Sequence, residues 1–180
     1  PRDAVAQLYS RSLQVALVSE TSVASEHLAF ARRPICKDSY VLAVPKGLDL
    51  FSIADPLHHP LPVEARVLRS VIQFTFGTLQ QQRIEAWFRS IFGYFETVAR
   101  TRQYESALAM VEKGLGVTLV PLLATQFEGR PLFSVDLYLV AEFERRIVAL
   151  YPSHYQRLEP FATFLEALAD AGRNLRLLAP

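Results

Sequence analysis

The sequence contains a single cysteine, Cys36, in 180 residues. One cysteine cannot form a disulfide within the chain, and such low cysteine use is typical of proteins kept in a reducing compartment. We therefore interpret Cys36 as a small buried apolar residue and expect a cytoplasmic protein.

The sequence also lacks an excess of charge of either sign. Its 19 Lys and Arg residues balance 18 Asp and Glu residues, which leaves a formal net charge of +1. A chain that binds nucleic acid or an anionic membrane through its surface charge usually carries a strong basic excess. The basic pairs Arg32-Arg33 and Arg145-Arg146 are predicted to be solvated strand ends. We expect no direct contact of this chain with DNA or with a membrane.

Long apolar runs and catalytic motifs are missing as well. The run Val117–Ala124 is far shorter than the roughly 20 residues of a membrane span, and the first residues do not resemble a signal peptide. The sequence has no P-loop, G-x-G-x-x-G, G-x-S-x-G or H-E-x-x-H motif. The pair His58-His59 lies in a proline-rich loop without a nearby Cys, and a surface position is favoured over a metal site. The protein is therefore predicted to be neither an enzyme nor a holder of metal or cofactor.

What the sequence does contain is enough apolar material for a core, since 51% of its residues are hydrophobic. Periodicity and turn signals predict helices over 3–11, 78–92, 103–114 and 159–172, and strands over 13–18, 40–44, 69–76, 95–101, 117–121 and 146–151. Gly93 and Gly114 are predicted to end the two middle helices. The last helix is expected to bury Phe161, Phe164, Leu165 and Leu168. Helices that follow strands in this order predict an α/β architecture with a mainly parallel sheet.

Hydroxyl groups gather at the ends of two predicted strands. Thr75-Phe76-Gly77-Thr78 joins the strand over 69–76 to a helix, and Ser19-Glu20-Thr21-Ser22 follows the strand over 13–18. Backbone N–H groups at a helix N-terminus attract negative charge, and small side chains let an anion or carboxylate approach. Two such turns facing each other would form a polar site for a small ligand.

Both turns also have a purely structural explanation, which the residues alone do not exclude. Thr78 is a suitable N-cap for its helix, and Ser19 is suited simply to end a strand. Gln103 occupies the N-cap position of the helix over 103–114 and has the same explanation. The sequence leaves the ligand and capping interpretations open.

The segment Tyr104–Pro121 resembles the effector-binding domain of LysR-type transcriptional regulators. In that family a helix ends in Val-x-x-Gly-Leu-Gly-Val and the next strand closes on a proline, as it does here. The run Leu-Gln-Val-Ala-Leu-Val over 13–18 and the segments Arg33–Pro45, Gln73–Thr78 and Arg145–Gly172 are similar to other parts of the domain. The resemblance covers nearly the whole chain.

This resemblance implies an α/β fold with two Rossmann-like lobes of the periplasmic-binding-protein type (type II), the first lobe being incomplete. Residues 1–34 and 146–180 would form the first lobe, and residues 35–145 the second. The winged helix-turn-helix of the family has no counterpart in the sequence. DNA would therefore be bound only by a domain absent here, and we expect the native protein to extend further toward its N-terminus.

The resemblance also implies a mechanism and a site. A small-molecule effector would bind between the lobes, shift the population of lobe arrangements, and act on DNA through a homodimer or homotetramer. The hydroxyl residues would contact the effector and the others would lie behind them. The implied ligand-binding residues are Ser19, Glu20, Thr75, Gly77, Thr78 and Gln103.

An alternative function is a solute-binding protein of the same two-lobed fold that serves transport. The residues before Pro1 would separate the two possibilities. A helix-turn-helix there marks a regulator, whereas a secretion signal marks a transport protein.

Overall fold

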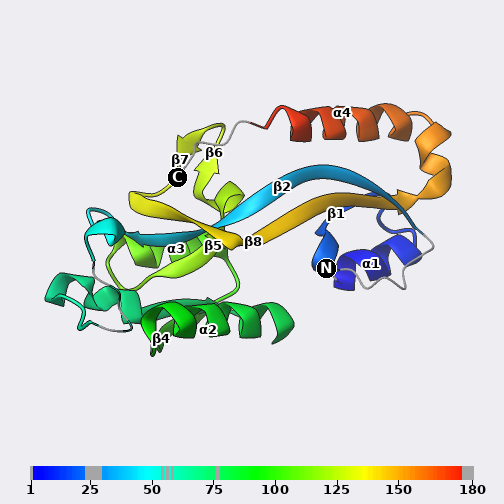
Figure 1. Cartoon of the computed structure of the whole chain (residues 1–180). Coiled ribbons are helices and arrows are strands. Elements are labelled where there is room, and N and C mark those ends of the chain that lie inside the picture. The colour runs from blue at the N-terminus through cyan, green and yellow to red at the C-terminus, as the bar shows by residue number, and fades with distance from the viewer. Residues whose placement is uncertain are drawn as a thin grey trace. The chain divides into compact units, whose positions relative to one another are not determined.

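A computed structural model of the chain describes residues 2–22, 30–53, 55, 57, 59–75 and 78–175. The chain divides into two compact units. Unit 1 is Pro1–Ser39 with Glu142–Arg176, and unit 2 is Tyr40–Ala141 with Leu177–Pro180. Two long strands, β2 (Phe30–Pro45) and β8 (Val135–Pro152), contribute residues to both units (Figure 1).

Every predicted helix and strand is present, although several bounds differ. The helices are α1 (Arg2–Tyr9), α2 (Thr78–Phe92), α3 (Tyr104–Glu112) and α4 (Phe161–Arg173). The remaining strands are β1 (Ala16–Ser19), β3 (Ser70–Phe74), β4 (Glu96–Thr101), β5 (Thr118–Pro121), β6 (Gln126–Phe127) and β7 (Arg130–Pro131). Short 3-10 turns occupy Glu20–Ser22, Leu50–Ser52, Val63–Arg69, Leu122–Thr125 and Ser153–Arg157.

The prediction of a mainly parallel sheet is wrong for the larger sheet. Its strand order is β1-β8-β2-β5, and both β1 with β8 and β2 with β5 pair antiparallel. β3 and β4, which α2 connects, form a parallel pair, and an isolated parallel bridge joins Val71 to Val117. A parallel pair needs a crossover connection, usually a helix, and no single helix links β1 to β8 or β2 to β5.

In unit 1, the two faces of β8 pack against different helices. Val148 and Leu150 lie in a cluster with Val5 and Leu8 of α1, whereas the alternate residues Ala149 and Tyr151 pack with Leu165 of α4. Successive strand residues point to opposite faces, so α1 and α4 cover β8 from opposite sides (Figure 1).

The expected inner face of α4 is only partly right. Leu165 is buried as predicted, but Phe164 is 51% exposed. The buried residue that accompanies Leu165 is Ala169, four positions later and therefore on the same side of the helix.

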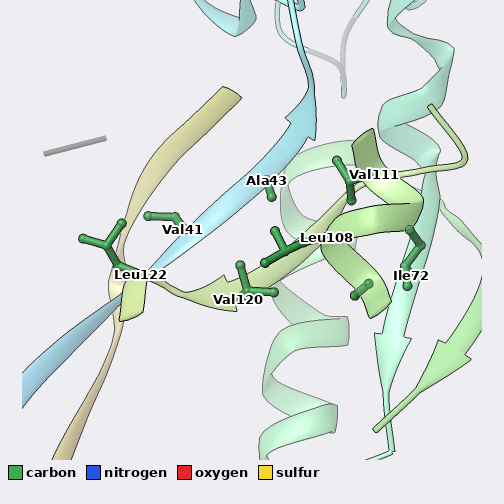
Figure 2. Packing of buried hydrophobic residues seen from close by; sticks show 8 residues of the cluster. Val41, Ala43, Ile72, Leu108, Val111, Val120 and Leu122 are labelled. Atoms are coloured by element: carbon green, nitrogen blue, oxygen red, sulfur yellow. The ribbon is translucent and has the colours of Figure 1, made fainter. Parts of the chain in front are cut away.

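In unit 2, α3 packs against strands β2, β3 and β5. Figure 2 shows Leu108 and Val111 of α3 among side chains from these strands, including Ala43, Ile72 and Val120. All of these residues are buried. This packing fixes β3, the strand that leads into the predicted ligand turn.

The chain turns away from helix α3 at Gly114, where the helix was predicted to end. The φ of Gly114 is +75°, a left-handed conformation that glycine adopts without strain. The Gly114 N–H donates to the Val111 carbonyl at 2.8 Å and the Leu115 N–H donates to the Met110 carbonyl at 3.0 Å. This pair of bonds is a Schellman motif, which turns the chain toward β5.

None of the helices in the described part of the chain combines the length and the apolar character that crossing a bilayer requires.

A glycine of α4 provides a test of the packing in unit 1. A methyl group added at Gly172 would overlap the Ile35 carbonyl oxygen of β2. We predict that Gly172→Ala lowers the free energy of unfolding by about 1–3 kcal/mol because of this overlap. Helix propensity alone predicts the opposite, a gain of about 1 kcal/mol.

Urea unfolding followed by circular dichroism would measure the change. The neighbouring Ala171 is exposed, so Ala171→Gly should act through helix propensity and cost about 1 kcal/mol. A Gly172→Ala protein more stable than the parent would contradict the described contact between α4 and β2.

Candidate functional site

The predicted ligand residues are divided between the two units. Ser19 ends β1, and Glu20 begins the 3-10 turn that follows it in unit 1. Thr75 and Gln103 are in unit 2, and helix α2 begins at Thr78. Gly77 and the Thr78 side chain lie outside the described residues. The structure therefore describes two separate groups, one in each unit.

Thr75 and Gln103 come together at the carboxyl ends of β3 and β4. These strands are parallel, with Phe74 opposite Thr101. The Thr75 N–H donates to the Thr101 carbonyl at 3.1 Å, and the Gln103 N–H donates to Thr101 Oγ1, also at 3.1 Å. Thr101 thus connects the two predicted site residues. The sequence alone did not identify it, although a hydroxyl two residues before an N-cap is a recognised turn signal.

The structure supports a capping position for Gln103. Its backbone is extended, as an N-cap requires, but its side chain makes no capping hydrogen bond to α3. Its Oε1 instead accepts a hydrogen bond from Ser106 Oγ at 3.1 Å. The Gln103 amide is therefore exposed at the start of α3 and held by a neighbouring hydroxyl.

In unit 1, the hydroxyl groups of Ser19 and Thr21 lie 3.1 Å apart. Ser19 also pairs with Ile147 of β8, so the sheet fixes its backbone. Thr21 is exposed and Ser19 is half-buried. This turn offers two adjacent hydroxyls at the end of β1, but the prediction of a strand buried on both faces is wrong, because Leu17 is 53% exposed.

A buried ion pair joins the two long strands within unit 1. Asp38 of β2 is fully buried, and the Nε and Nη2 atoms of Arg145 in β8 lie 2.8 and 2.7 Å from its Oδ2. The prediction that Arg145 is a solvated strand end is wrong. Because β8 begins at Val135, eleven positions before Arg146, Arg145 lies inside the strand and its side chain is only 22% exposed.

Cys36 lies two residues before this ion pair and is half-buried rather than buried. Burial raises the pKa of its thiol above the ordinary value of 9.0, the Asp38 carboxylate raises it further, and the Arg145 cation opposes both effects. A thiol in this environment stays protonated at neutral pH and is a poor nucleophile.

A pocket in unit 2 lies beside strand β3 and helix α2. Its apolar lining includes Ile84, Phe88 and Leu119, and its polar lining includes Gln73 and Gln81. The amide nitrogens of both glutamines donate to one carboxylate oxygen of Glu85, at 3.2 and 2.9 Å. This group was not predicted from the sequence. The sequence feature that could have indicated it is Gln73, a glutamine inside an otherwise apolar strand.

Within the described ranges, no three His, Cys, Asp or Glu side chains are grouped as metal ligands would be.

Comparison with known proteins relates the chain to one domain family. The family model described as the LysR substrate binding domain matches residues 1–173. No curated protein sequence matches the chain.

Solved regulatory domains have a similar fold. The reduced OxyR regulatory domain from Pseudomonas aeruginosa is 14% identical with a TM-score of 0.65, over 97% of this chain and 79% of that one. The CcmR regulatory domain of Synechocystis PCC6803 in complex with 2-PG is 14% identical with a TM-score of 0.66, over 96% and 80%. The C-terminal domain of a probable LysR family regulator from Rhodococcus sp. RHA1 is 17% identical with a TM-score of 0.63, over 93% and 80%. The predicted type II periplasmic-binding-protein-like α/β fold is confirmed.

The buried ion pair leads to a prediction about stability. Arg145→Met leaves the Asp38 carboxylate buried without its cation, so the free energy of unfolding should fall by about 3 kcal/mol. Arg146→Met is a matched control, since the Arg146 side chain is 62% exposed and lies 3.8 Å from Glu144; its expected effect is below about 0.5 kcal/mol. Equal effects of the two substitutions in urea unfolding would refute the assignment.

The raised pKa of Cys36 leads to a prediction about pH. A thiol whose folded pKa exceeds its unfolded pKa contributes stability that is complete below the unfolded value and is lost as the pH rises through the folded value. The free energy of unfolding should therefore fall more between about pH 8 and about pH 10 in the parent protein than in Cys36→Ala. Identical losses in the two proteins would contradict the stated environment of the thiol.

Proposed function

The chain belongs to the LysR substrate-binding domain family, and from this premise we propose that it senses a small-molecule effector for a bacterial transcription regulator. One observation carries the proposal: the family model matches residues 1–173, which include the described parts of both units. The family is one of transcription regulators rather than enzymes, and the proposed role involves binding without catalysis.

The proposed effector would contact polar groups of both units, which we take as the two lobes of the fold. Unit 1 would contribute Ser19 and Glu20 as contacts to the effector. Unit 2 would contribute Thr75, Gly77 and Thr78, with Gln103 behind them. The exposed position of Thr75 at the end of β3 supports this assignment. The start of the 15-residue helix α2 favours an anionic effector, because N–H groups at a helix N-terminus carry partial positive charge.

Regulation would proceed by population shift. An effector that binds one arrangement of the lobes better than another stabilises that arrangement, by an amount set by the difference in affinity. A homodimer or homotetramer in the cytoplasm would carry the change to a DNA-binding domain outside this sequence. The CcmR regulatory domain in complex with 2-PG is a precedent for ligand binding by this fold.

The direct test uses the full-length protein that contains this chain. Titration calorimetry against a panel of metabolites identifies a ligand, and operator binding is then measured with and without it. The proposal predicts saturable binding together with a changed affinity for the operator. Saturable binding that leaves DNA binding unchanged would reject the regulatory role and favour a solute-binding role in transport.

The assignment of Thr75 has a test of its own. Thr75→Val replaces the hydroxyl with a methyl group of similar size, so effector binding should weaken by about 1–3 kcal/mol because a ligand polar group loses its partner. Thr97→Val, near the start of β4, is the matched control and should leave affinity unchanged. Calorimetry with the identified effector measures both variants. Equal affinity of Thr75→Val and the parent would remove Thr75 from the site.

A further inference from the structure

The middle residues of strand β3 are buried on both faces of the strand, and one of these buried side chains is polar. Ile72 belongs to the core cluster beneath α3 (Figure 2), whereas Gln73, the next residue, is hydrogen-bonded to Glu85 of α2. Only 6% of Gln73 is exposed. The strand therefore places an amide in the pocket described above, between β3 and α2.

This amide is only half satisfied. The Gln73 Nε2 donates to Glu85 Oε1 at 3.2 Å, but the Gln73 Oε1 is buried and has no hydrogen-bond partner. Rotating the amide by half a turn does not help, because an ionised carboxylate only accepts hydrogen bonds and would then face another acceptor. The carboxylate thus fixes which end of Gln73 lacks a partner.

A buried acceptor without a partner is unfavourable, and a donor that reaches it stabilises the protein. The pocket that Gln73 lines is otherwise largely apolar, with surface from Ile84, Phe88 and Leu119. A matching ligand therefore combines an O–H or N–H group with an apolar body.

The charge of Glu85 further limits which ligands the pocket can bind. Glu85 Oε1 already accepts hydrogen bonds from Gln73 and Gln81. Its other oxygen, Oε2, lies 3.9 Å from Nη2 of Arg89, whose side chain is 65% exposed. A carboxylate ligand would approach a charge of its own sign at short range, so an anion is disfavoured.

We propose that unit 2 contains a second ligand site, at Gln73 and Glu85, for a small molecule without negative charge that presents an O–H or N–H donor on an apolar body. The site lies wholly within unit 2. It does not rest on the effector function proposed above, and its chemistry is the reverse of the anion-attracting turn at Thr75–Thr78.

The experiment titrates the 180-residue protein with phenol, toluene and benzoate and follows the backbone and glutamine side-chain amides by NMR. Phenol carries the donor, toluene lacks it, and benzoate adds the disfavoured charge. Phenol should bind saturably, shift the Gln73 amide signals, and bind about tenfold more tightly than toluene, which corresponds to one hydrogen bond. Benzoate should bind more weakly than phenol.

Two variants make the result specific. Gln73→Met keeps the side-chain length and removes the acceptor, so phenol should lose its advantage over toluene. Gln82→Met makes the same change at an exposed position of α2 and should bind phenol as the parent does. If Gln73→Met does not fold, Glu85→Gln provides a second measurement. Its amide can donate to Gln73 Oε1 once the Gln73 amide rotates, and phenol binding should weaken.

The proposal is overturned by equal binding of phenol and toluene to the parent protein, or by undiminished phenol binding to Gln73→Met. Absence of saturable phenol binding also overturns it and indicates that water alone satisfies Gln73 Oε1. These measurements use neither the effector nor DNA, so their failure leaves the regulatory proposal untouched.

Discussion

The ion pair between Asp38 and Arg145 joins the two strands that carry the chain between its units. β2 and β8 are neighbours in the sheet, and each contributes residues to both units. A slip of one residue in either strand would turn one member of the pair to the opposite face and leave a buried charge alone. The pair therefore favours one register, and the packing of α1 and α4 on alternate residues of β8 depends on that register.

Elements defined by local signals could be predicted from the sequence. Gly93 and Gly114 both adopt positive φ where the helices were expected to end, and β3, α2 and β4 follow each other as a parallel unit. The lengths of β2 and β8 could not be predicted. Polar residues such as Lys37, Asp38 and Glu144 interrupt the apolar pattern, and only contacts between strands distant in sequence explain them.

In the candidate site, too, some features could be predicted from the sequence and others depend on contacts between distant segments. The proximity of Thr75 and Gln103 follows from the rule that parallel strands end at the same edge of a sheet. Thr101, which connects them, depends on the exact pairing of β3 with β4. Gln73 and Glu85 are twelve residues apart and meet only because α2 packs back on β3. An amide in an apolar strand indicated an unusual position, but its partner was visible only in three dimensions.

The division of the chain also has a consequence for the order of folding. Within the described residues unit 2 is one continuous segment, Tyr40–Ala141, whereas unit 1 is assembled from residues on both sides of it. During synthesis Tyr40–Ala141 emerges before the part of β8 that completes unit 1. Ala16 of β1 pairs with Leu150 of β8, about 130 positions later along the chain. The apolar cluster that α1 and β1 form with Val148 and Leu150 of β8 is therefore completed only after the residues of unit 2 have been synthesised.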